Sequence, residues 1–388
     1  MKYKIFLLIM LGMLTAFGPF VTDMYVPSLP SMVTYFHTTI ALVQAGLTAS
    51  MLGLAAGQLL FGPLSDKYGR RRPLMASLVL FAVSSTAILF SPTIHVFVAL
   101  RFVQGFAGAG GIVISRSVAT DMYSGRELMK ILGITGAING IAPIMAPVAG
   151  GALVDHGGWR MIFALLLMVG VALMAGSWFM RESLPVERRT TRSLPATFKL
   201  FGVVVRNRTY MLYVLHQAAA LAILFGNISS SPFIVQEHYG LSPLGYSIVF
   251  GLNGASLAIG AGSSMKFRRA TTCVKVSCAG MLAGSLLVAV ALMADAGLAV
   301  YEVLLDLMLV SVGFTLTAST TLALDCAREE AGTASALFGA VGFVAGGVVS
   351  PLVGMGSIMH SSAITFVTAA VLALAFAVPA LRRSAAAH

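Results

Sequence analysis

Gly62-Pro-Leu-Ser-Asp66-Lys-Tyr-Gly69-Arg70-Arg-Arg-Pro73 is a charged segment between two long apolar runs. It combines one carboxylate with several cations and with glycines, which allow the backbone to bend sharply. Asp66 could pair with an arginine or cap a helix N-terminus, and either contact would latch neighbouring helices in one state. On charge alone, the segment also fits an ordinary basic loop of a membrane protein.

The composition of the whole chain indicates a membrane protein. Of 388 residues, 58% are hydrophobic and 10% are charged, which leaves too few polar residues to cover a soluble domain. Apolar stretches of about eighteen or more residues recur, and each can cross a bilayer core of roughly 30 Å. The 40 glycines suit close contact between helices in lipid.

Charged or turn-rich breaks divide the chain into apolar runs of membrane-spanning length. The predicted spans are 5–25, 40–63, 73–91, 94–120, 128–153, 159–180, 209–233, 243–265, 271–293, 297–324, 331–356 and 361–381. The longest break is the basic stretch 181–208, which we expect to be a cytosolic linker. It separates an N-terminal six-helix bundle, residues 1–180, from a C-terminal one, residues 209–388.

The two halves echo each other weakly. Ala146-Pro-Val-Ala-Gly-Gly-Ala152 and Ala345-Gly-Gly-Val-Val-Ser-Pro351 pair small residues with proline at matching positions in their halves. Two related bundles facing a central cavity are a transporter layout with the substrate near the midplane. We therefore expect an all-α membrane protein of twelve transmembrane helices in two pseudo-symmetric six-helix bundles.

The formal charge of +11 is distributed as in a multi-pass membrane protein and not as in a nucleic-acid binder. If the chain starts in the cytosol, almost all of its 25 Lys and Arg fall in predicted cytosolic segments, and Arg160 lies outside. This positive-inside bias predicts that both termini are cytosolic. It excludes nucleic acid as the expected partner and makes the lipid bilayer the surroundings of the chain.

No cofactor or metal is expected. Cys273, Cys278 and Cys326 match no disulfide or metal pattern and are interpreted as packing residues. No lysine follows a glycine, so the chain has no Walker loop, and no His-Glu-x-x-His sequence is present. An intramembrane enzyme is therefore disfavoured, as is a membrane sensor, which would normally carry a sizeable soluble output domain.

The full pattern of the Gly62–Pro73 segment resembles the signature loop of the major facilitator superfamily. Further segments are similar to the Bcr/CflA-type drug-resistance exporters, the bicyclomycin and chloramphenicol proton antiporters. These segments are Asp23-Met-Tyr-Val-Pro27-Ser-Leu-Pro30, Arg101-Phe-Val-Gln104-Gly105, Asp121-Met-Tyr, Ser231-Pro-Phe-Ile-Val-Gln-Glu237, Tyr239-Gly-Leu-Ser-Pro243 and Ala331-Gly-Thr-Ala-Ser-Ala-Leu-Phe-Gly339. The resemblance covers nearly the whole chain and implies a twelve-helix, alternating-access drug:proton antiporter.

The resemblance also implies two structural motifs. A conformational latch would comprise Gly62, Asp66, Gly69, Arg70 and Asp121. The antiporter motif of the fifth span would comprise Ala146, Pro147, Gly150 and Gly151. The chain departs from the family in two places, because Ala146 replaces the usual glycine before the proline and Thr120 stands where a second arginine is frequent.

Asp23 and Arg101 are the first pair of ionisable residues at membrane depth. Such groups cost roughly 2.5–3.5 kcal/mol each on insertion scales. Arg101 lies roughly 10 Å below the outer surface at about 1.5 Å per residue, a depth close to that of Asp23. Burial favours a neutral carboxyl and a nearby arginine favours the carboxylate, so Asp23 is the candidate proton carrier and Arg101 its tuning partner. Alternatively, Asp23 caps a helix or pairs at the interface.

Glu302 and Asp306 are a second candidate, because they are spaced i,i+4 and share one helix face. Asp306 is predicted to be the more buried of the two, and we include it among the proton-coupling residues. The pair is a second proton site, a site for a cationic drug, or the lining of a wet cavity entrance. These alternatives stay open.

Polar and aromatic residues inside the spans are candidates for substrate binding. Aromatic walls suit a flat, partly apolar ligand, and amides can orient it. The candidates are Tyr25, Gln104, Asn139, Phe225, Asn227, Phe233 and Asn253. The same residue types also serve as interhelical hydrogen-bond partners or as packing.

The expected function is efflux of drugs, driven by the proton gradient across a bacterial inner membrane. The expected partners are small drug-like molecules and protons, and a monomer is expected. Because Asp23 is the main deep acid of the N-terminal half, neutral compounds such as phenicols are favoured, while Glu302 and Asp306 keep cationic compounds open. The alternative is a proton-coupled exporter or facilitator of a natural metabolite such as a sugar.

Overall fold

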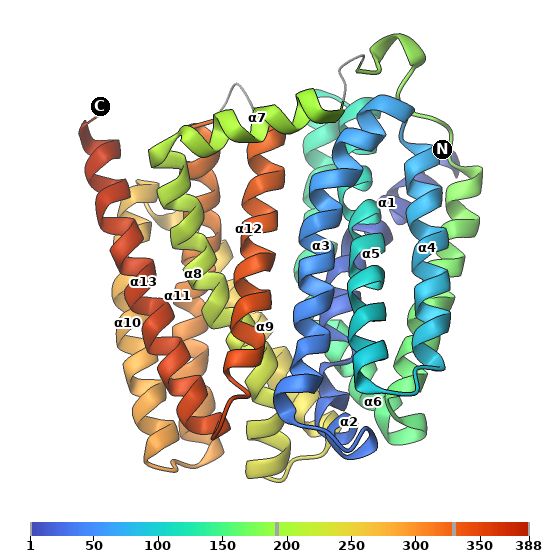
Figure 1. Cartoon of the computed structure of the whole chain (residues 1–388). Helices are drawn as coiled ribbons and strands as arrows, with labels where there is room; N and C mark the ends of the chain where they lie inside the picture. The colour runs from blue at the N-terminus through green and yellow to red at the C-terminus, as the bar shows by residue number, and fades with distance from the viewer. Residues whose placement is uncertain (1, 191–193, 328–330, 387–388) are drawn as a thin grey trace. The chain divides into compact units, whose positions relative to one another are not determined.

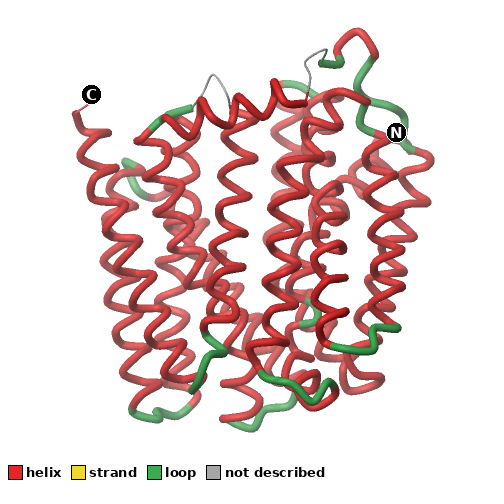
Figure 2. The backbone as a smooth tube through the Cα atoms, viewed as in Figure 1, coloured by secondary structure: helices red, strands yellow, loops and turns green. Residues whose placement is uncertain are grey.

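The computed structural model of the chain describes residues 2–190, 194–327 and 331–386, and in these ranges it contains helices and loops but no strand (Figures 1 and 2). The predicted all-α class is confirmed. By their internal contacts, the residues form two compact units. Unit 1 comprises Met1–Thr38 and Ala49–Thr197, and unit 2 comprises Thr39–Thr48 and Phe198–His388.

Unit 1 is built from long helices that follow the predicted spans. Its elements are α1 (Lys2–Asp23), the 3₁₀ turn η1 (Val26–Ser28), α2 (Leu29–Tyr35), most of α3 (Ile40–Tyr68), α4 (Arg71–Leu89), α5 (Ile94–Met122), α6 (Gly125–Phe179) and the 3₁₀ turn η2 (Val186–Arg188).

Helix α6 joins two of the predicted spans across a kink at Gly157 and Gly158. Gly158 has φ 66° and ψ −167°, a backbone conformation that side chains with a Cβ rarely adopt. The kink falls between the predicted spans 128–153 and 159–180. The chain therefore bends back at this point, and α6 supplies two of the predicted helices.

Unit 2 contains the remaining long helices and, by its contacts, the first turns of α3. Its further elements are α8 (Arg208–Pro232), the π-helical turn η3 (Phe233–His238), α9 (Pro243–Ser263), the 3₁₀ turn η4 (Ser264–Lys266), α10 (Ala270–Met293), α11 (Leu298–Asp325), α12 (Ala331–Leu352) and α13 (Ile358–Ala386).

The predicted linker 181–208 is more ordered than its charge suggests. It contains η2 and the helix α7 (Leu194–Arg206), which runs at a steep angle to α8 in Figure 1. Val204 of α7 is buried in a cluster with Tyr210 and Tyr213 of α8. Apolar residues recur at helical spacing in this segment, and this periodicity favours a helix with one packed face. This helix was not predicted from the sequence, because the charge of the segment suggested a linker.

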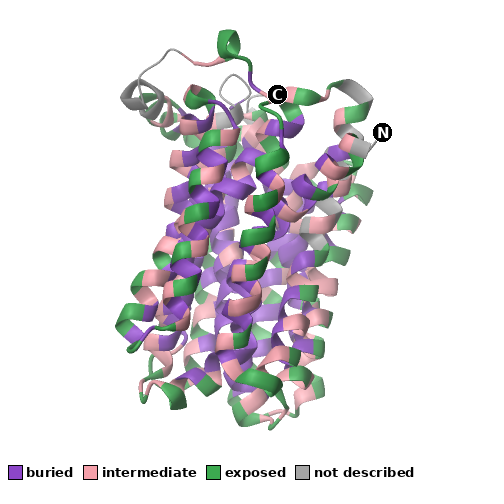
Figure 3. Cartoon of the chain, turned by 90° about the vertical axis from the view of Figure 1, so that its right-hand side faces the viewer, coloured by how far each residue is buried: buried purple, intermediate pink, exposed green. Residues whose placement is uncertain are grey.

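Among the described residues, eleven helices are long and apolar enough to cross a membrane, and the kink divides the one ending at Phe179 into two arms. The prediction of twelve transmembrane helices is confirmed in this sense. Figure 3 shows buried residues where helices meet and exposed ones on outward faces. Val83, Met168 and Leu307 are 61%, 61% and 62% exposed, as expected for side chains that face lipid.

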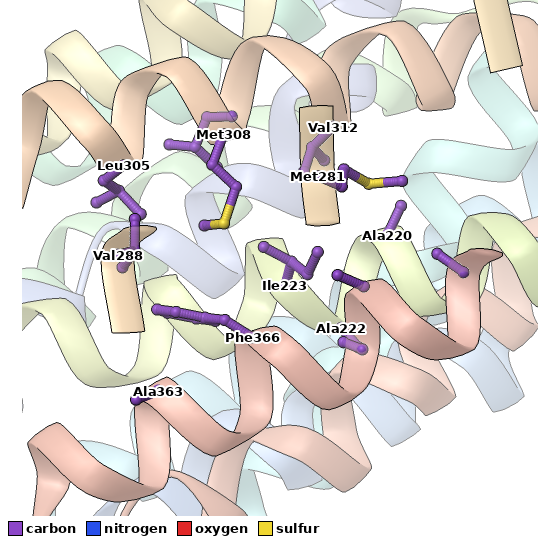
Figure 4. Packing of buried hydrophobic residues seen from close by; sticks show 14 of the residues in the cluster. Ala220, Ala222, Ile223, Met281, Val288, Leu305, Met308, Val312, Ala363 and Phe366 are labelled. Carbon is purple, nitrogen blue, oxygen red and sulfur yellow. The ribbon is translucent and has the colours of Figure 1, made fainter. Parts of the chain in front are cut away.

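The interior of unit 2 is filled by apolar side chains from four helices. Ile223 of α8, Met281 of α10, Met308 of α11 and Phe366 of α13 are each fully buried and belong to one cluster (Figure 4). Alanines fill the remaining space of this cluster, which lets the helix backbones approach closely. This packing fixes α8, which carries Asn227, and α11, which carries Glu302 and Asp306.

Each unit contains two helices that pack closely because a glycine of each lies against the backbone of the other. In unit 1, a Cβ added to Gly53 of α3 would lie 2.2 Å from a carbonyl oxygen of α5, and one added to Gly105 of α5 would lie 2.1 Å from a carbonyl oxygen of α3. In unit 2, Gly260 of α9 and Gly313 of α11 have the same reciprocal relation, at 2.1 and 2.3 Å. The two halves therefore share a packing rule that their sequences show only weakly.

Candidate functional site

The first candidate group lies where α1 ends. Asp23 is the last residue of α1, and the turn that follows contains Pro27, which cannot continue the hydrogen bonding of a helix. Asp23 is 4% exposed, and its Oδ1 has no hydrogen-bond partner among the described residues. A buried carboxylate oxygen without a partner is costly in apolar surroundings, so the position favours a carboxyl that takes up a proton.

Arg101 of α5 lies beside the same end of α1 and is fully buried. Its Nη2 donates to the carbonyl oxygen of Val21 at 2.8 Å, and its Nη1 donates to Gln104 Oε1. The guanidinium carbon lies 4.2 Å from the centroid of the Tyr25 ring, which is a cation–π contact. Within the described part of the chain, Arg101 forms no ion pair with Asp23. The two groups are therefore near each other in the fold while Arg101 is held by neutral acceptors.

Two substrate-binding candidates of unit 1 are engaged in this arrangement. Tyr25 is fully buried and packs against Phe97 and Phe163, with ring centroids 6.3 and 5.7 Å away. Gln104 accepts from Arg101 and donates through Nε2 to Ser85 Oγ at 2.8 Å. Both residues thus hold Arg101 in place, and their direct contact with a substrate stays a prediction.

The predicted antiporter motif packs against the chain segment that follows Asp23. A Cβ added to Gly150 of α6 would lie 1.7 Å from the carbonyl oxygen of Met24. Only glycine permits this approach, because any side chain would overlap the backbone. Ala146 is fully buried on the same helix, so this position accommodates the methyl group of alanine in place of the usual glycine. The motif therefore sets the position of the residue next to Asp23.

The predicted latch residues meet around Arg70, between α3 and α4. Arg70 Nε and Nη2 donate to Asp121 Oδ2 and Oδ1 of α5 at 2.8 and 3.3 Å, a bidentate ion pair whose side chains are 9% and 8% exposed. Arg70 Nη1 donates to Asp66 Oδ1 and to Ser65 Oγ. Burial lowers the pKa of Arg70, but the hydrogen bonds and charges of Asp121 and Asp66 outweigh it, so the pKa lies above its ordinary value.

Two latch residues were missed by the sequence analysis. Glu182 Oε1 and Oε2 accept from the backbone N–H groups of Arg70 and Arg71 at 2.8 and 3.2 Å. Ser183 Oγ donates to Asp121 Oδ2 at 3.0 Å. Both follow the end of α6 and are far from the loop in sequence, so spacing alone could not reveal them.

The two latch glycines differ in importance. Gly69 has φ +87°, and a Cβ there would lie 2.6 Å from Glu182 Oε2, so the turn requires glycine. At Gly62, the nearest atom to an added Cβ is a Val113 methyl at 3.6 Å, an ordinary van der Waals contact. The backbone therefore requires glycine at position 69 and not at position 62, and the latch role of both stays a prediction.

A second polar cluster lies in unit 2, where α8, α9 and α11 meet. The side-chain amide of Asn253 (α9) donates to Glu302 Oε2 at 2.8 Å and to Asp306 Oδ1 at 3.1 Å. Its Oδ1 accepts from Asn227 Nδ2 of α8 at 3.4 Å. Glu302 Oε1 and Asn227 Oδ1 are buried without a hydrogen-bond partner among the described residues. The cluster thus joins the predicted residues Asn227, Asn253 and Asp306 and leaves acceptor oxygens unused.

Unit 2 also contains the aromatic candidates Phe225 and Phe233, and Tyr239 lies close enough to Glu302 to be affected by its charge. Burial, followed by the charges of Asp295 and Glu302, raises the pKa of the Tyr239 hydroxyl, which donates to the carbonyl of Ala296 at 2.6 Å. Phe233 is fully buried at the start of the π-helical turn, and Phe225 lies against Phe343 with ring centroids 5.9 Å apart. Their role as walls for a ligand stays a prediction.

The remaining expectations concern Asn139 and metals. The side chain of Asn139 lies outside the described residues, so its predicted contact with substrate stays a prediction. No group of three or more His, Cys, Asp or Glu side chains within the described ranges could hold a metal ion.

Comparison with known proteins gives the family. Residues 11–351 match the model of the Major Facilitator Superfamily. The uncharacterized MFS-type transporter YdgK of Bacillus subtilis (strain 168) is 37% identical over 385 residues, covering 97% of this chain and 95% of the relative.

Two further relatives carry resistance names. A chloramphenicol resistance protein of Pseudomonas aeruginosa is 34% identical over 230 residues, covering 59% of this chain and 54% of that protein. A bicyclomycin resistance protein homolog of Haemophilus influenzae (strain ATCC 51907 / DSM 11121 / KW20 / Rd) is 27% identical over 365 residues, covering 91% and 89%.

Among solved structures, a bacterial homolog of the human lysosomal transporter Spinster, in an inward-facing and unoccupied conformation, matches with a TM-score of 0.77. It shares 17% identity and covers 98% of this chain and 97% of that chain, so it bears on the fold alone. The chain therefore belongs to the Major Facilitator Superfamily of membrane transporters, and within it is similar to the Bcr/CflA-type drug-resistance proteins.

Proposed function

We propose that this chain exports small drug-like molecules in exchange for protons, by alternating access. The observation that carries the proposal is the state of Asp23, which is buried at the end of α1 with one carboxylate oxygen unpartnered among the described residues. Its chain neighbour Met24 touches Gly150 of the antiporter motif, so movement of α6 would act directly on this carboxyl.

A proton antiporter needs a carboxyl that releases its proton on one side of the membrane and regains it on the other. In apolar surroundings the protonated form of Asp23 is favoured, whereas a nearby guanidinium favours the carboxylate. Arg101 is now held by Val21, Gln104 and Tyr25. A shift of Arg101 from these partners towards Asp23 would favour release of the proton. Arg101 is thus the proposed tuning group.

The relatives named for chloramphenicol and bicyclomycin resistance support drugs as the cargo class. Within this class we favour neutral, phenicol-type compounds, because Asp23 and Arg101 together contribute no net charge when both are ionised. The predicted substrate contacts are Tyr25, Gln104, Asn139, Phe225, Asn227, Phe233 and Asn253.

Glu302 and Asp306 extend the proposal to unit 2. Two carboxylates that share the amide of Asn253 repel each other, and this repulsion favours uptake of a proton or an organic cation. We propose that Asp306 takes part in coupling as a second proton site, with Glu302 as its partner. Cationic drugs would compete with protons for this pair.

The proposal includes the surroundings of the protein. It works as a monomer in a bacterial inner membrane, with both termini in the cytosol. It uses no cofactor, because the proton gradient supplies the energy. Its partners are protons, the cargo and the lipid bilayer, and nucleic acid has no part.

The experiment uses everted membrane vesicles with an acid interior and a fluorescent ΔpH probe. Chloramphenicol, florfenicol, bicyclomycin, a fluoroquinolone and ethidium are added one at a time. Recovery of probe fluorescence on addition of a compound, absent from vesicles without the protein, is the expected result and identifies the substrate class. If no compound gives recovery, drug:proton antiport is contradicted and a metabolite exporter or a uniporter takes its place.

A further inference from the structure

Unit 2 contains a large groove that the proposed transport function does not use. It has a volume of about 1530 Å³ and lies where α8 begins, α11 ends and α10 and α13 pass each other. Its rim carries Arg269 and Lys275 from the α10 side and Arg382 and Arg383 from α13. Deeper in the groove, the lining is apolar and includes Leu282 and Leu374.

The rim is strongly cationic. Arg269, Lys275, Arg382 and Arg383 are all exposed, and none of them takes part in an ion pair among the described residues. Asp325 is the one acid in the lining that the structure describes. Four cations and one carboxylate leave a net positive rim, which attracts an anionic group and repels a cationic one.

The walls change from charged to apolar with depth. On α10, the lining runs from Ala270 to Leu282, which is about 18 Å at about 1.5 Å per residue. On α13, it runs from Arg383 back to Leu374, about 14 Å by the same measure. One leaflet of hydrocarbon is roughly 15 Å thick, half of the roughly 30 Å core. The groove therefore matches one leaflet in both length and polarity.

We infer that this groove binds an anionic phospholipid of the leaflet on the side where α13 ends. The phosphate and any further headgroup anion lie on the cationic rim, and an acyl chain lies along the apolar walls of α10 and α13. A soluble phosphate would use the rim only and would leave the apolar walls without a partner. A zwitterionic lipid would bring its own cation against the four that are already there, so the groove selects for net negative headgroups.

The test is a lipid titration of the purified full chain in mild detergent, read by native mass spectrometry. Phosphatidylglycerol and phosphatidylcholine with the same acyl chains are compared for the wild type and for Arg269→Gln/Lys275→Gln. The matched control is Lys266→Gln/Arg268→Gln, which removes the same charge just before α10, outside the groove lining.

The wild type is expected to bind phosphatidylglycerol more tightly than phosphatidylcholine. Each removed rim cation is expected to weaken phosphatidylglycerol binding roughly fivefold, so the rim variant loses roughly 25-fold. The control is expected to stay within about twofold of the wild type, because its charges do not line the groove. Excess inorganic phosphate should not displace the lipid.

A second variant tests the apolar wall without touching the charges. Val378 lines the groove on α13 and is 38% exposed, so Val378→Trp can fill the groove while the helix packing stays intact. This variant should weaken phosphatidylglycerol binding although the rim cations are all present. Its elution volume and its thermal midpoint without lipid should equal those of the wild type, which shows that the variant folds.

The inference is overturned if the two lipids bind equally well to the wild type. It is also overturned if the control loses as much as the rim variant, because the attraction would then be general to the basic end. Displacement by inorganic phosphate would make the site a soluble-anion site instead. If Val378→Trp binds phosphatidylglycerol as tightly as the wild type, the lipid does not lie in the groove.

Discussion

In unit 1, the deep cation Arg101 lies beside the α1 end that carries Asp23, whereas in unit 2 the two deep acids Glu302 and Asp306 share only the amide of Asn253. Unit 1 thus contains an acid and a base near each other. Unit 2 contains two acids, and within the described residues neither forms an ion pair.

The same contrast recurs at the other end of the helices. In unit 1, Arg70 is neutralised by Asp121 and Asp66. In unit 2, the corresponding loop after α9 contributes Arg269 to a groove rim whose four cations have no ion pair among the described residues. At these two places unit 1 sets acids and bases close together, whereas unit 2 leaves charges that ions, substrates or lipids from outside can satisfy.

The largest expected effect comes from the packing of α1 on α6 in unit 1. Gly150→Leu places a side chain where an added Cβ would already lie 1.7 Å from the Met24 carbonyl oxygen, so α1 and α6 must separate. Export of the identified drug should fall to background in whole-cell efflux. Gly262→Ala in unit 2 is the control, since nothing lies within 4 Å of a Cβ there, and it should export normally. Normal export by Gly150→Leu would show that this contact has no role.

The next effect tests how unit 1 holds its deep cation. Arg101→Ala leaves the Val21 carbonyl and Gln104 without their donor, and hydrogen bonds to a charged group are worth about 1.5–3 kcal/mol each. Export should fall by about 100-fold, a loss of about 3 kcal/mol at about 1.4 kcal/mol per tenfold. Arg101→Lys should recover part of this, because one ammonium cannot satisfy both acceptors and the Tyr25 face. Equal export by the alanine and lysine variants would argue against a role for the charge.

The latch separates a buried pair from an exposed one. Asp121→Asn breaks an ion pair whose side chains are 9% and 8% exposed, and loss of one partner of a buried pair costs about 3–5 kcal/mol. Asp66 is 52% exposed, and its pair with Arg70 is worth at most about 1 kcal/mol. The thermal midpoint in detergent should therefore drop clearly for Asp121→Asn and little for Asp66→Asn. A larger drop in the midpoint for Asp66→Asn than for Asp121→Asn would mean that the pair of Arg70 with Asp66 is the stronger of the two.

The smallest effect is selective and concerns the acids of unit 2. Glu302→Gln removes one carboxylate from the cluster and keeps a side chain of the same size. Transport of ethidium should fall about fivefold, the effect of about 1 kcal/mol of charge attraction, and chloramphenicol transport should fall less, because it loses only the contribution of Glu302 to the second proton site. Glu237→Gln removes an exposed acid of the same unit outside the cluster and serves as the control. An equal loss for both drugs would mean that the pair acts in coupling alone and not on substrate charge.

The helices were predictable because hydrophobicity and length identify membrane spans directly, and the Gly157–Gly158 kink falls in the predicted break. The contact of Asp66 with Arg70 was also predictable, since the two residues are four positions apart. Helix α7 was not predicted, because the prediction for segment 181–208 used its charge and not the spacing of its apolar residues.

Long-range contacts escaped prediction for a physical reason. The long-range partner of Arg101 is a backbone carbonyl, which every residue possesses and which leaves no trace in a sequence. Glu182 reaches Arg70 across 112 positions, and no spacing rule links them. Arg101 does lie beside the end of α1 that carries Asp23, but the hydrogen bonding around them depends on packing that only the fold supplies.

The measurement that tests the central claim most directly is proton release from everted vesicles on addition of the identified drug, with wild type and Asp23→Asn compared. Asp155→Asn, an exposed acid of unit 1, is the matched control. Drug binding measured on the purified proteins shows that each variant is folded. The account predicts that Asp23→Asn binds drug but releases no protons, while Asp155→Asn behaves as the wild type. Normal proton release by Asp23→Asn would contradict the assignment of Asp23 as the proton carrier.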